Sequence, residues 1–434
     1  MTIVITGATG FLGLQLLPHL VGGGRRIVAL TRRGRPPVEE RLTRCLRAQG
    51  VPEHAVRAVA DRVHGVPVDL NRADLGLAPW QFSQLAAEAD EFWHLAGHVG
   101  LNAPAAAVTR TNVAGTAHLL NLAAAAGPGA RVHHVSTAFV AGGRGSGTVH
   151  ETQLNGDHGF ENAYERSKFE AEQHIRRWAA ERRAKVVVFR PSILVSDRPS
   201  AVGTPSNPLA ELARAFGLLT ALLPGMPPGM PPGTPPGASV DPSGRRTGDP
   251  TGGPSAATPL VRIDGREGAH LNLLPVDAAA RLMHELAGRL DPVPGTPSTC
   301  HITHYQETSV QTVFEAVGAL HGLRIRLTPG PITDATDLER FAARATRAFA
   351  PYANHRRTYL RTTLREHRLD GDGIASIDRA YLVRGMQRIP ADLGADFGLA
   401  AAATTRSSAG SASPTGTFVA PASRLSLALA RPGA

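Results

Sequence analysis

The chain has 434 residues, enough for one large domain or two smaller ones, and a formal net charge of +10. Of its 46 basic side chains only Lys168 and Lys185 are lysines, so the charge reflects a bias towards arginine and predicts a diffusely basic surface. Because no nucleic-acid-binding motif accompanies that charge, we expect no nucleic-acid partner. The sequence has no cationic leader before an apolar stretch and no run of about 18 apolar residues. This predicts a soluble cytoplasmic protein without an integral membrane segment.

The chain opens on an apolar strand, residues 2–6, which runs into a glycine-spaced turn and then an apolar helix. Gly7 lets the strand turn tightly, Gly10 lets the backbone approach a pyrophosphate, and Gly13 lets the helix pack on the strand. An ordinary strand-to-helix connection is the alternative. We expect the turn to bind a dinucleotide through Gly7, Thr9, Gly10, Phe11, Leu12 and Gly13.

A second buried strand, residues 26–30, completes a βαβ unit and is followed by Arg32, where NAD-binding proteins have a carboxylate that reads the ribose 2′-hydroxyl. A guanidinium pairs instead with a 2′-phosphate, so Arg32 favours NADP(H). A surface turn in an arginine-biased chain is the alternative. The third strand, residues 63–70, ends in Asp69 and Leu70, which we expect beside the adenine.

Further apolar strands are predicted at residues 91–97, 131–140, 185–189 and 298–303, with helical stretches between them. This alternation predicts an α/β fold: a Rossmann-like doubly wound parallel sheet with a smaller, mostly helical C-terminal substrate region. His94 at the end of one strand has no acidic or cysteine partner nearby, so we expect no metal site.

The pattern also divides the chain. We expect residues 1–198, completed by about 258–290, to form the NADP-binding Rossmann domain. Residues 199–257 contain a helix and then, from 224, a Pro/Gly-rich flexible insertion. The remaining stretches are a C-terminal substrate or lid region at 291–397, which is basic and predicted to be helical over 338–388, and a disordered tail at 398–434.

Tyr164 and Lys168 lie four residues apart on a predicted amphipathic helix, so they share one face. In a chain that otherwise uses arginine, a lysine indicates a site where a guanidinium does not serve; an accidental surface pair is the alternative. With Thr137 at a strand end and Asn112 before a helix, the pair makes a carbonyl-reduction site. We expect Lys168 to lower the pKa of Tyr164, Thr137 to bind the developing oxyanion, and Asn112 to position Lys168 or a water.

These stretches resemble the extended short-chain dehydrogenase/reductase superfamily, which has a Thr-Gly-x-x-Gly-x-x-Gly turn, here residues 6–13, and a Tyr-x-x-x-Lys pair. The resemblance implies that Thr137, Tyr164 and Lys168 are catalytic and that Pro191 and Ile193 line the nicotinamide. Further stretches are similar to the thioester reductase branch, which includes fatty acyl-CoA reductases and the terminal reductase domains of carboxylic acid reductases and peptide synthetases. They are residues 112–116, 135–140, 164–168, 189–193 and 273–277.

That branch implies NADPH-dependent reduction of an acyl thioester, on CoA or a carrier protein, to an aldehyde, with onward reduction to the alcohol left open. Since the sequence has no adenylation or carrier domain, we expect the thioester to come from a separate partner. The basic stretch 338–388 is suited to an acidic carrier or to CoA phosphates. The alternatives are a sugar-nucleotide epimerase or dehydratase, a hydroxy-ketone dehydrogenase, and a non-catalytic nucleotide sensor. The insertion at 224–257 departs from the branch and leaves the substrate open.

Overall fold

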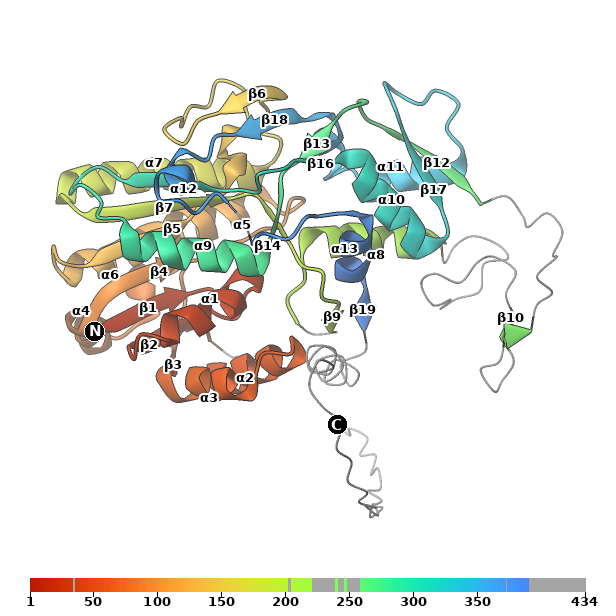
Figure 1. Ribbon diagram of the computed structural model, residues 1–434. Coiled ribbons are helices and arrows are strands. Elements are labelled where there is room, and N and C mark those ends of the chain that lie inside the picture. The colour runs from red at the N-terminus through yellow and green to blue at the C-terminus, as the bar shows by residue number, and fades with distance from the viewer. Residues whose placement is uncertain are drawn as a thin grey trace, which may run out of the picture.

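In the computed structural model, the described residues are 1–33, 36–201, 204–220, 239–240, 246–247, 258–371 and 373–389. The centre is a parallel sheet of seven strands in the order β15-β7-β5-β4-β1-β2-β3 (Figure 1). The strands are β1 (Thr2–Thr6), β2 (Arg26–Arg32), β3 (Val63–Val68), β4 (Ala89–His94), β5 (Arg131–Val135), β7 (Lys185–Pro191) and β15 (Ser298–Ile302). The predicted Rossmann-like doubly wound sheet is confirmed. The strand order reverses between β1 and β4, which is where such sheets bind ligands.

Helices cover both faces of the sheet (Figure 1). One face carries α1 (Phe11–Val21), α2 (Val38–Ala48), α3 (Glu53–Arg62) and α9 (Val276–Arg289). The other carries α4 (Pro79–Glu88), α6 (Gly115–Ala125) and α7 (Ala163–Arg182). The strands of the sheet are therefore buried from both sides. The centre of β7 is accordingly a continuous apolar run, Val186 to Phe189, in which each side chain is no more than 1% exposed.

A second hydrophobic core lies in the C-terminal region. Its elements are α8 (Pro208–Thr220), β12 (Leu260–Asp264), α10 (Val310–His321), β17 (Arg324–Thr328), α11 (Asp337–Ala345) and α13 (Arg379–Met386). Phe139 and Val195, which follow β5 and β7, belong to this core. The region therefore sits at the carboxyl ends of the sheet strands, where it borders the predicted cofactor site.

The prediction that residues 338–388 are helical is only partly right. Between α11 and α12 (Thr362–Glu366) the chain forms a strand, β18 (Arg356–Tyr359), which pairs in parallel with β6 (Ser146–Val149). The predicted tail at 398–434 and most of the predicted insertion at 224–257 lie outside the described residues. No helix in the described part of the chain has both the length and the apolar character needed to cross a membrane.

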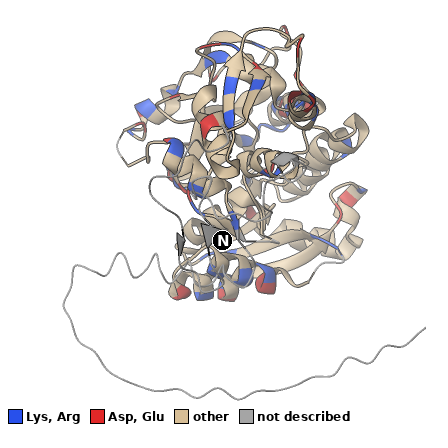
Figure 2. Cartoon of the chain, turned by 90° about the vertical axis from the view of Figure 1, so that its right-hand side faces the viewer, with Lys and Arg blue, Asp and Glu red and all other residues tan. Residues whose placement is uncertain are grey.

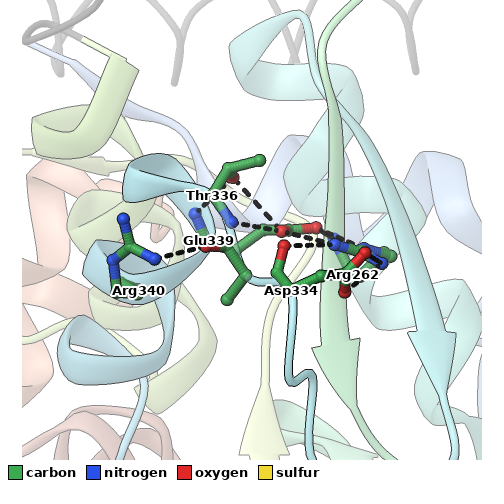
Figure 3. Close-up of polar contacts among 6 residues, drawn as sticks. Arg262, Asp334, Thr336, Glu339 and Arg340 are labelled. Carbon is green, nitrogen blue, oxygen red and sulfur yellow. Dashed lines mark hydrogen bonds and ion pairs between the residues drawn. The ribbon is translucent and has the colours of Figure 1, made fainter.

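Basic residues are spread over strands and helices and interspersed with acidic ones, as Figure 2 shows for one side of the molecule. Several are fixed by carboxylates. Arg262 on β12 donates to Asp334 (2.9 Å) and to Glu339 (2.7 Å), which ties the strand to α11 (Figure 3). Glu339 also accepts a hydrogen bond from the Thr336 backbone at the start of that helix, completing a capping box. Hydrogen bonding from Arg262 holds the pKa of Glu339 well below its usual range.

We predict that Glu339→Gln destabilises this region, because glutamine keeps the capping box but loses the charge that faces Arg262. A carboxylate with a depressed folded pKa stabilises the protein above the unfolded pKa of about 4.3, and this stabilisation is lost as the pH falls through the folded pKa. Thermal unfolding at pH 7 should give a melting temperature lower by roughly 2 °C. The difference should vanish in acid. Asp337→Asn, at an exposed position of the same helix, is the control; an equal effect there would contradict the prediction.

Candidate active site

The glycine turn between β1 and α1 is shaped by backbone contacts that exclude larger residues. Gly7 has φ +75°, and a Cβ atom at this position would lie 2.7 Å from the Ala96 amide nitrogen. A Cβ at Gly13 would lie 2.3 Å from the Gly7 carbonyl oxygen, so helix and turn approach as closely as the sequence predicts. The first turn of α1 has no capping side chain and no acidic residue. These features fit a dinucleotide phosphate.

The residues predicted to read the cofactor's adenosine half surround this turn. Arg32 ends β2 with an exposed side chain. Asp69 follows β3, and its carboxylate accepts a hydrogen bond from the Asn71 amide (3.0 Å). Leu70 lies beside it and is partly buried. The structure adds Arg41 from α2, whose guanidinium donates to the Thr9 hydroxyl (3.0 Å). Sequence reasoning missed Arg41, although the helix after the second strand flanks this turn in every doubly wound sheet.

Thr137, Tyr164 and Lys168 come together at the carboxyl end of β5. Asn162, two residues before Tyr164, caps α7 by accepting a hydrogen bond from the Glu165 amide (3.0 Å), so the helix begins at Ala163. The Lys168 ammonium group donates to the Val135 carbonyl at the end of the strand (2.8 Å). Two residues further on, the Thr137 hydroxyl lies within hydrogen-bonding reach of the Tyr164 phenol.

The pKa values of this group differ from those predicted. Burial raises the pKa of Tyr164 to about 12, opposed by the hydrogen bond to Thr137 and reinforced by the charge of Glu165. The net shift of the Tyr164 pKa is therefore upward, opposite to the direction that the sequence predicts, and a lowering by Lys168 stays a prediction. Burial lowers the pKa of Lys168 itself to about 8, while the carboxylate of Glu172 opposes the shift. A phenol with so high a pKa stays protonated at neutral pH.

Asn112 lies in a single π-helical turn, Arg110–Ala114, at the start of α6. Its amide group donates to the His98 carbonyl (3.1 Å) and to the Ser167 hydroxyl (2.8 Å), and its oxygen accepts from the His98 amide (2.7 Å). No hydrogen bond joins it to Lys168 among the described contacts. Both side chains nevertheless face Gly97, where a Cβ would lie 3.2 Å from the Asn112 oxygen and 3.5 Å from the Lys168 nitrogen.

Pro191 and Ile193 lie at the end of β7, beside the same group. The Thr137 hydroxyl donates to the Pro191 carbonyl (3.4 Å), and Ile193 begins β8 (Ile193–Val195), which pairs with β14 (Leu273–Pro275). This position suits the predicted nicotinamide contact. His94, also at the sheet edge, is buried between the hydroxyls of Thr6 (2.7 Å) and Thr116 (3.0 Å).

Sequence reasoning missed the buried ion pair beneath this site. Glu172 lies one helical turn after Lys168 and is fully buried, as is Arg190. The Arg190 guanidinium donates twice to the Glu172 carboxylate, at 3.0 and 2.5 Å. The Ser136 hydroxyl (3.1 Å) and Arg176 (3.1 Å) donate to the same carboxylate. The available signal was the spacing of Tyr164, Lys168 and Glu172, which places all three on one helix face.

We predict that Glu172→Gln lowers stability by about 3 kcal/mol, because it leaves the Arg190 charge buried without a counter-ion. The urea midpoint measures the loss, with Glu170→Gln, on another face of the helix, as the control. A midpoint equal to that of the control would show that the charge of Glu172 does not matter for folding.

The fold and this edge of the sheet define a class: a dinucleotide-binding protein with the residues of a short-chain reductase. The family model described as male sterility protein, an NAD-binding family, matches residues 5–222. The chain therefore belongs to this family, which is thioester reductase-like, and the predicted resemblance is confirmed.

Two curated relatives are much longer than this chain. Over 143 residues the chain is 36% identical to a glycine betaine reductase of Emericella nidulans, covering 31% of this chain and 11% of that protein. Over 204 residues it is 31% identical to an isonitrile lipopeptide synthase of Streptomyces coeruleorubidus, covering 46% and 13%. A solved structure, the terminal R domain from the myxalamid PKS-NRPS biosynthetic pathway, superposes with a TM-score of 0.63 at 21% identity over 89% of each chain. The superposition on this R domain shows a shared fold.

Proposed function

We propose that the protein reduces an acyl thioester to an aldehyde with NADPH. The observation that carries the proposal is the gathering of Thr137, Tyr164 and Lys168 at the carboxyl edge of the sheet, beside a glycine turn that fits a dinucleotide. The thioester reductase-like family and a relative named as a glycine betaine reductase support a reductase that acts on an acyl group. Acyl thioester, NADPH and a proton give aldehyde, thiol and NADP⁺.

The cofactor would be held by the residues from Gly7 to Gly13, by Arg32 and Asp69, and by Pro191 and Ile193, and it supplies the hydride. Thr137 and Tyr164 donate hydrogen bonds to the thioester carbonyl oxygen and stabilise the negative charge that develops there. The Tyr164 phenol is protonated at neutral pH and acts as the proton donor. The Lys168 ammonium, fixed on the Val135 carbonyl, keeps a positive charge at this edge of the sheet. Asn112 holds the loop at His98 and so acts as a positioning residue.

The thioester would arrive on CoA or on a separate acyl carrier protein. Exposed arginines of the C-terminal region, such as Arg344, Arg347 and Arg379, suit the acidic surface of a carrier or the CoA phosphates.

The test is NADPH oxidation, followed by absorbance, with a panel of acyl-CoA and acyl-carrier thioesters, and identification of the product. We expect aldehyde formation by the wild type. Tyr164→Phe should lower kcat by about 10²–10⁴-fold, because the proton donor is lost, while NADPH binding measured by fluorescence persists. Turnover of a nucleotide sugar or a ketone, with no thioester reduced, would refute the proposal in favour of another extended reductase activity.

The preference for NADPH is tested at Arg32. We expect Arg32→Gln to raise the KM for NADPH by about 10–100-fold, since a hydrogen bond to a charged group is lost, and to leave the KM for NADH unchanged. Arg57→Gln, an exposed arginine on α3, is the control. Equal losses with both cofactors would contradict a role of Arg32 at the 2′-phosphate.

A further inference from the structure

The stretch from Arg357 to Arg361 buries side chains that usually face water. In a strand alternate residues share a face, so Arg357 and Tyr359 of β18 point to one side, and Arg361 follows two residues after the strand as the N-cap of α12. Arg357 is only 2% exposed and Arg361 only 8%. On the opposite face, Arg356 and Thr358 are exposed. The strand thus turns Arg357 inward and Arg356 outward.

No carboxylate lies within ion-pair distance of these two guanidinium groups among the described residues, although the charge of Asp370 acts on Arg361 and the charges of Glu165 and Arg357 act on each other. Arg357 donates to the backbone carbonyls of Gly142 and Arg144, and Arg361 donates to that of Asp370. The second terminal nitrogen of each arginine, Nη2 of Arg357 and Nη1 of Arg361, is buried without a hydrogen-bond acceptor. Arg190, equally deep in the same protein, shows the opposite arrangement, with a carboxylate on its guanidinium.

Two further buried groups accompany them. One oxygen of Glu307 makes no hydrogen bond, and the Tyr359 hydroxyl has the Arg357 guanidinium beside it. The Arg357 guanidinium carbon lies 5.8 Å from the centre of the Tyr359 ring, and the charge of Glu307 acts on both Tyr359 and Arg361. We refer to Arg357, Tyr359, Arg361 and Glu307 as the arginine cluster. Burial raises the pKa of Glu307, which makes it a weak counter-ion for two guanidinium groups.

The cluster adjoins the candidate active site on two sides. The Arg357 guanidinium carbon lies 4.8 Å from the ring centre of Phe139, two residues after the predicted catalytic threonine. Glu307 accepts a hydrogen bond from the Asn272 side chain (3.1 Å), and the Asn272 carbonyl accepts one from the amide of Ile193, the predicted nicotinamide contact (3.3 Å). A group bound by the cluster would therefore lie next to the reacting carbonyl.

Buried charges without an ion-pair partner and buried donors without an acceptor are costly to folding. Arg357 and Arg361 each combine the two beside the candidate active site, which indicates that they bind a ligand. Two guanidinium forks and a phenol are donors that match a carboxylate. We propose that the arginine cluster binds a carboxylate carried by the acyl group of the substrate. The enzyme would then select thioesters whose acyl chain ends in an acid. This inference rests on the proposed thioester reductase function.

A phosphate is the other anion that arginines bind in this chemistry, and CoA and carrier arms both carry one. The phosphate sits at the far end of the arm from the sulfur, whereas the cluster is buried beside the predicted site of reaction. An acyl carboxylate is therefore the better match. Thioesters of N-acetylcysteamine contain no phosphate, so an effect of the cluster on these substrates comes from the acyl carboxylate and not from an arm phosphate.

The experiment compares N-acetylcysteamine half-thioesters of straight-chain dicarboxylic acids of four to ten carbons with their methyl esters, and measures kcat/KM with NADPH. For at least one chain length we expect kcat/KM for the free acid to exceed that for its methyl ester by about 10-fold or more, because the ester loses a hydrogen-bonded charge. Arg357→Met and Arg361→Met should each bring this ratio close to one. Arg356→Met, on the outer face of the same strand, should keep the wild-type ratio. Tyr359→Phe should lower the acid-to-ester ratio. This smaller substitution replaces the arginine variants as the test if those variants fail to fold.

Equal kcat/KM values for acid and ester at every chain length in the wild type would overturn the inference while leaving the reductase function in place. A preference for CoA over N-acetylcysteamine thioesters that depends on Arg357, without any preference for the acid, would also overturn it and assign the cluster to the arm phosphate. If no thioester is reduced at all, the proposed function fails instead.

Discussion

The buried ion pair of Glu172 and Arg190 is the constraint on which the arrangement of the site depends. Glu172 is one helical turn from Lys168, Arg190 directly precedes Pro191, and the Ser136 hydroxyl on the same carboxylate directly precedes Thr137. One carboxylate thus fixes a helix and two strand ends around the reacting position. Because a buried charge without its partner is far less stable than the pair, these elements keep their mutual positions or lose them together.

The pair also explains the electrostatics of the site. Burial lowers the pKa of Lys168, and the Glu172 carboxylate opposes that shift. At Tyr164 burial raises the pKa, and the hydrogen bond to Thr137 opposes the rise. The outcome is a phenol that stays protonated at neutral pH beside a buried ammonium group. Proton abstraction from an alcohol would need the reverse shift at Tyr164.

Local patterns in the sequence predict much of this molecule. The seven sheet strands follow from apolar runs, and the turn follows from glycine spacing, because each depends on neighbouring residues only. The rarity of tyrosine and lysine in the chain, together with the helical spacing of Tyr164 and Lys168, identifies this pair as a candidate site. Local patterns do not predict three other features: the Glu172–Arg190 contact, the raised pKa of Tyr164 and the contact of Arg41 with Thr9. Each arises from burial and from segments that only the tertiary fold brings together.

The same composition that makes Lys168 informative hides the arginine cluster. In a chain where nearly every basic residue is arginine, Arg357 and Arg361 have the appearance of ordinary surface charge, and an alternation of arginine with tyrosine and threonine does not indicate which face is buried. The usual rule, polar residues outward, does not separate Arg357 from Arg356, because each face of β18 carries one arginine. Only the burial of Arg357 against Phe139 distinguishes it from its exposed neighbour Arg356. In this protein, rarity identifies Tyr164 and Lys168, which we predict to be catalytic, whereas burial without an ion-pair partner identifies the residues that we assign to the acyl group.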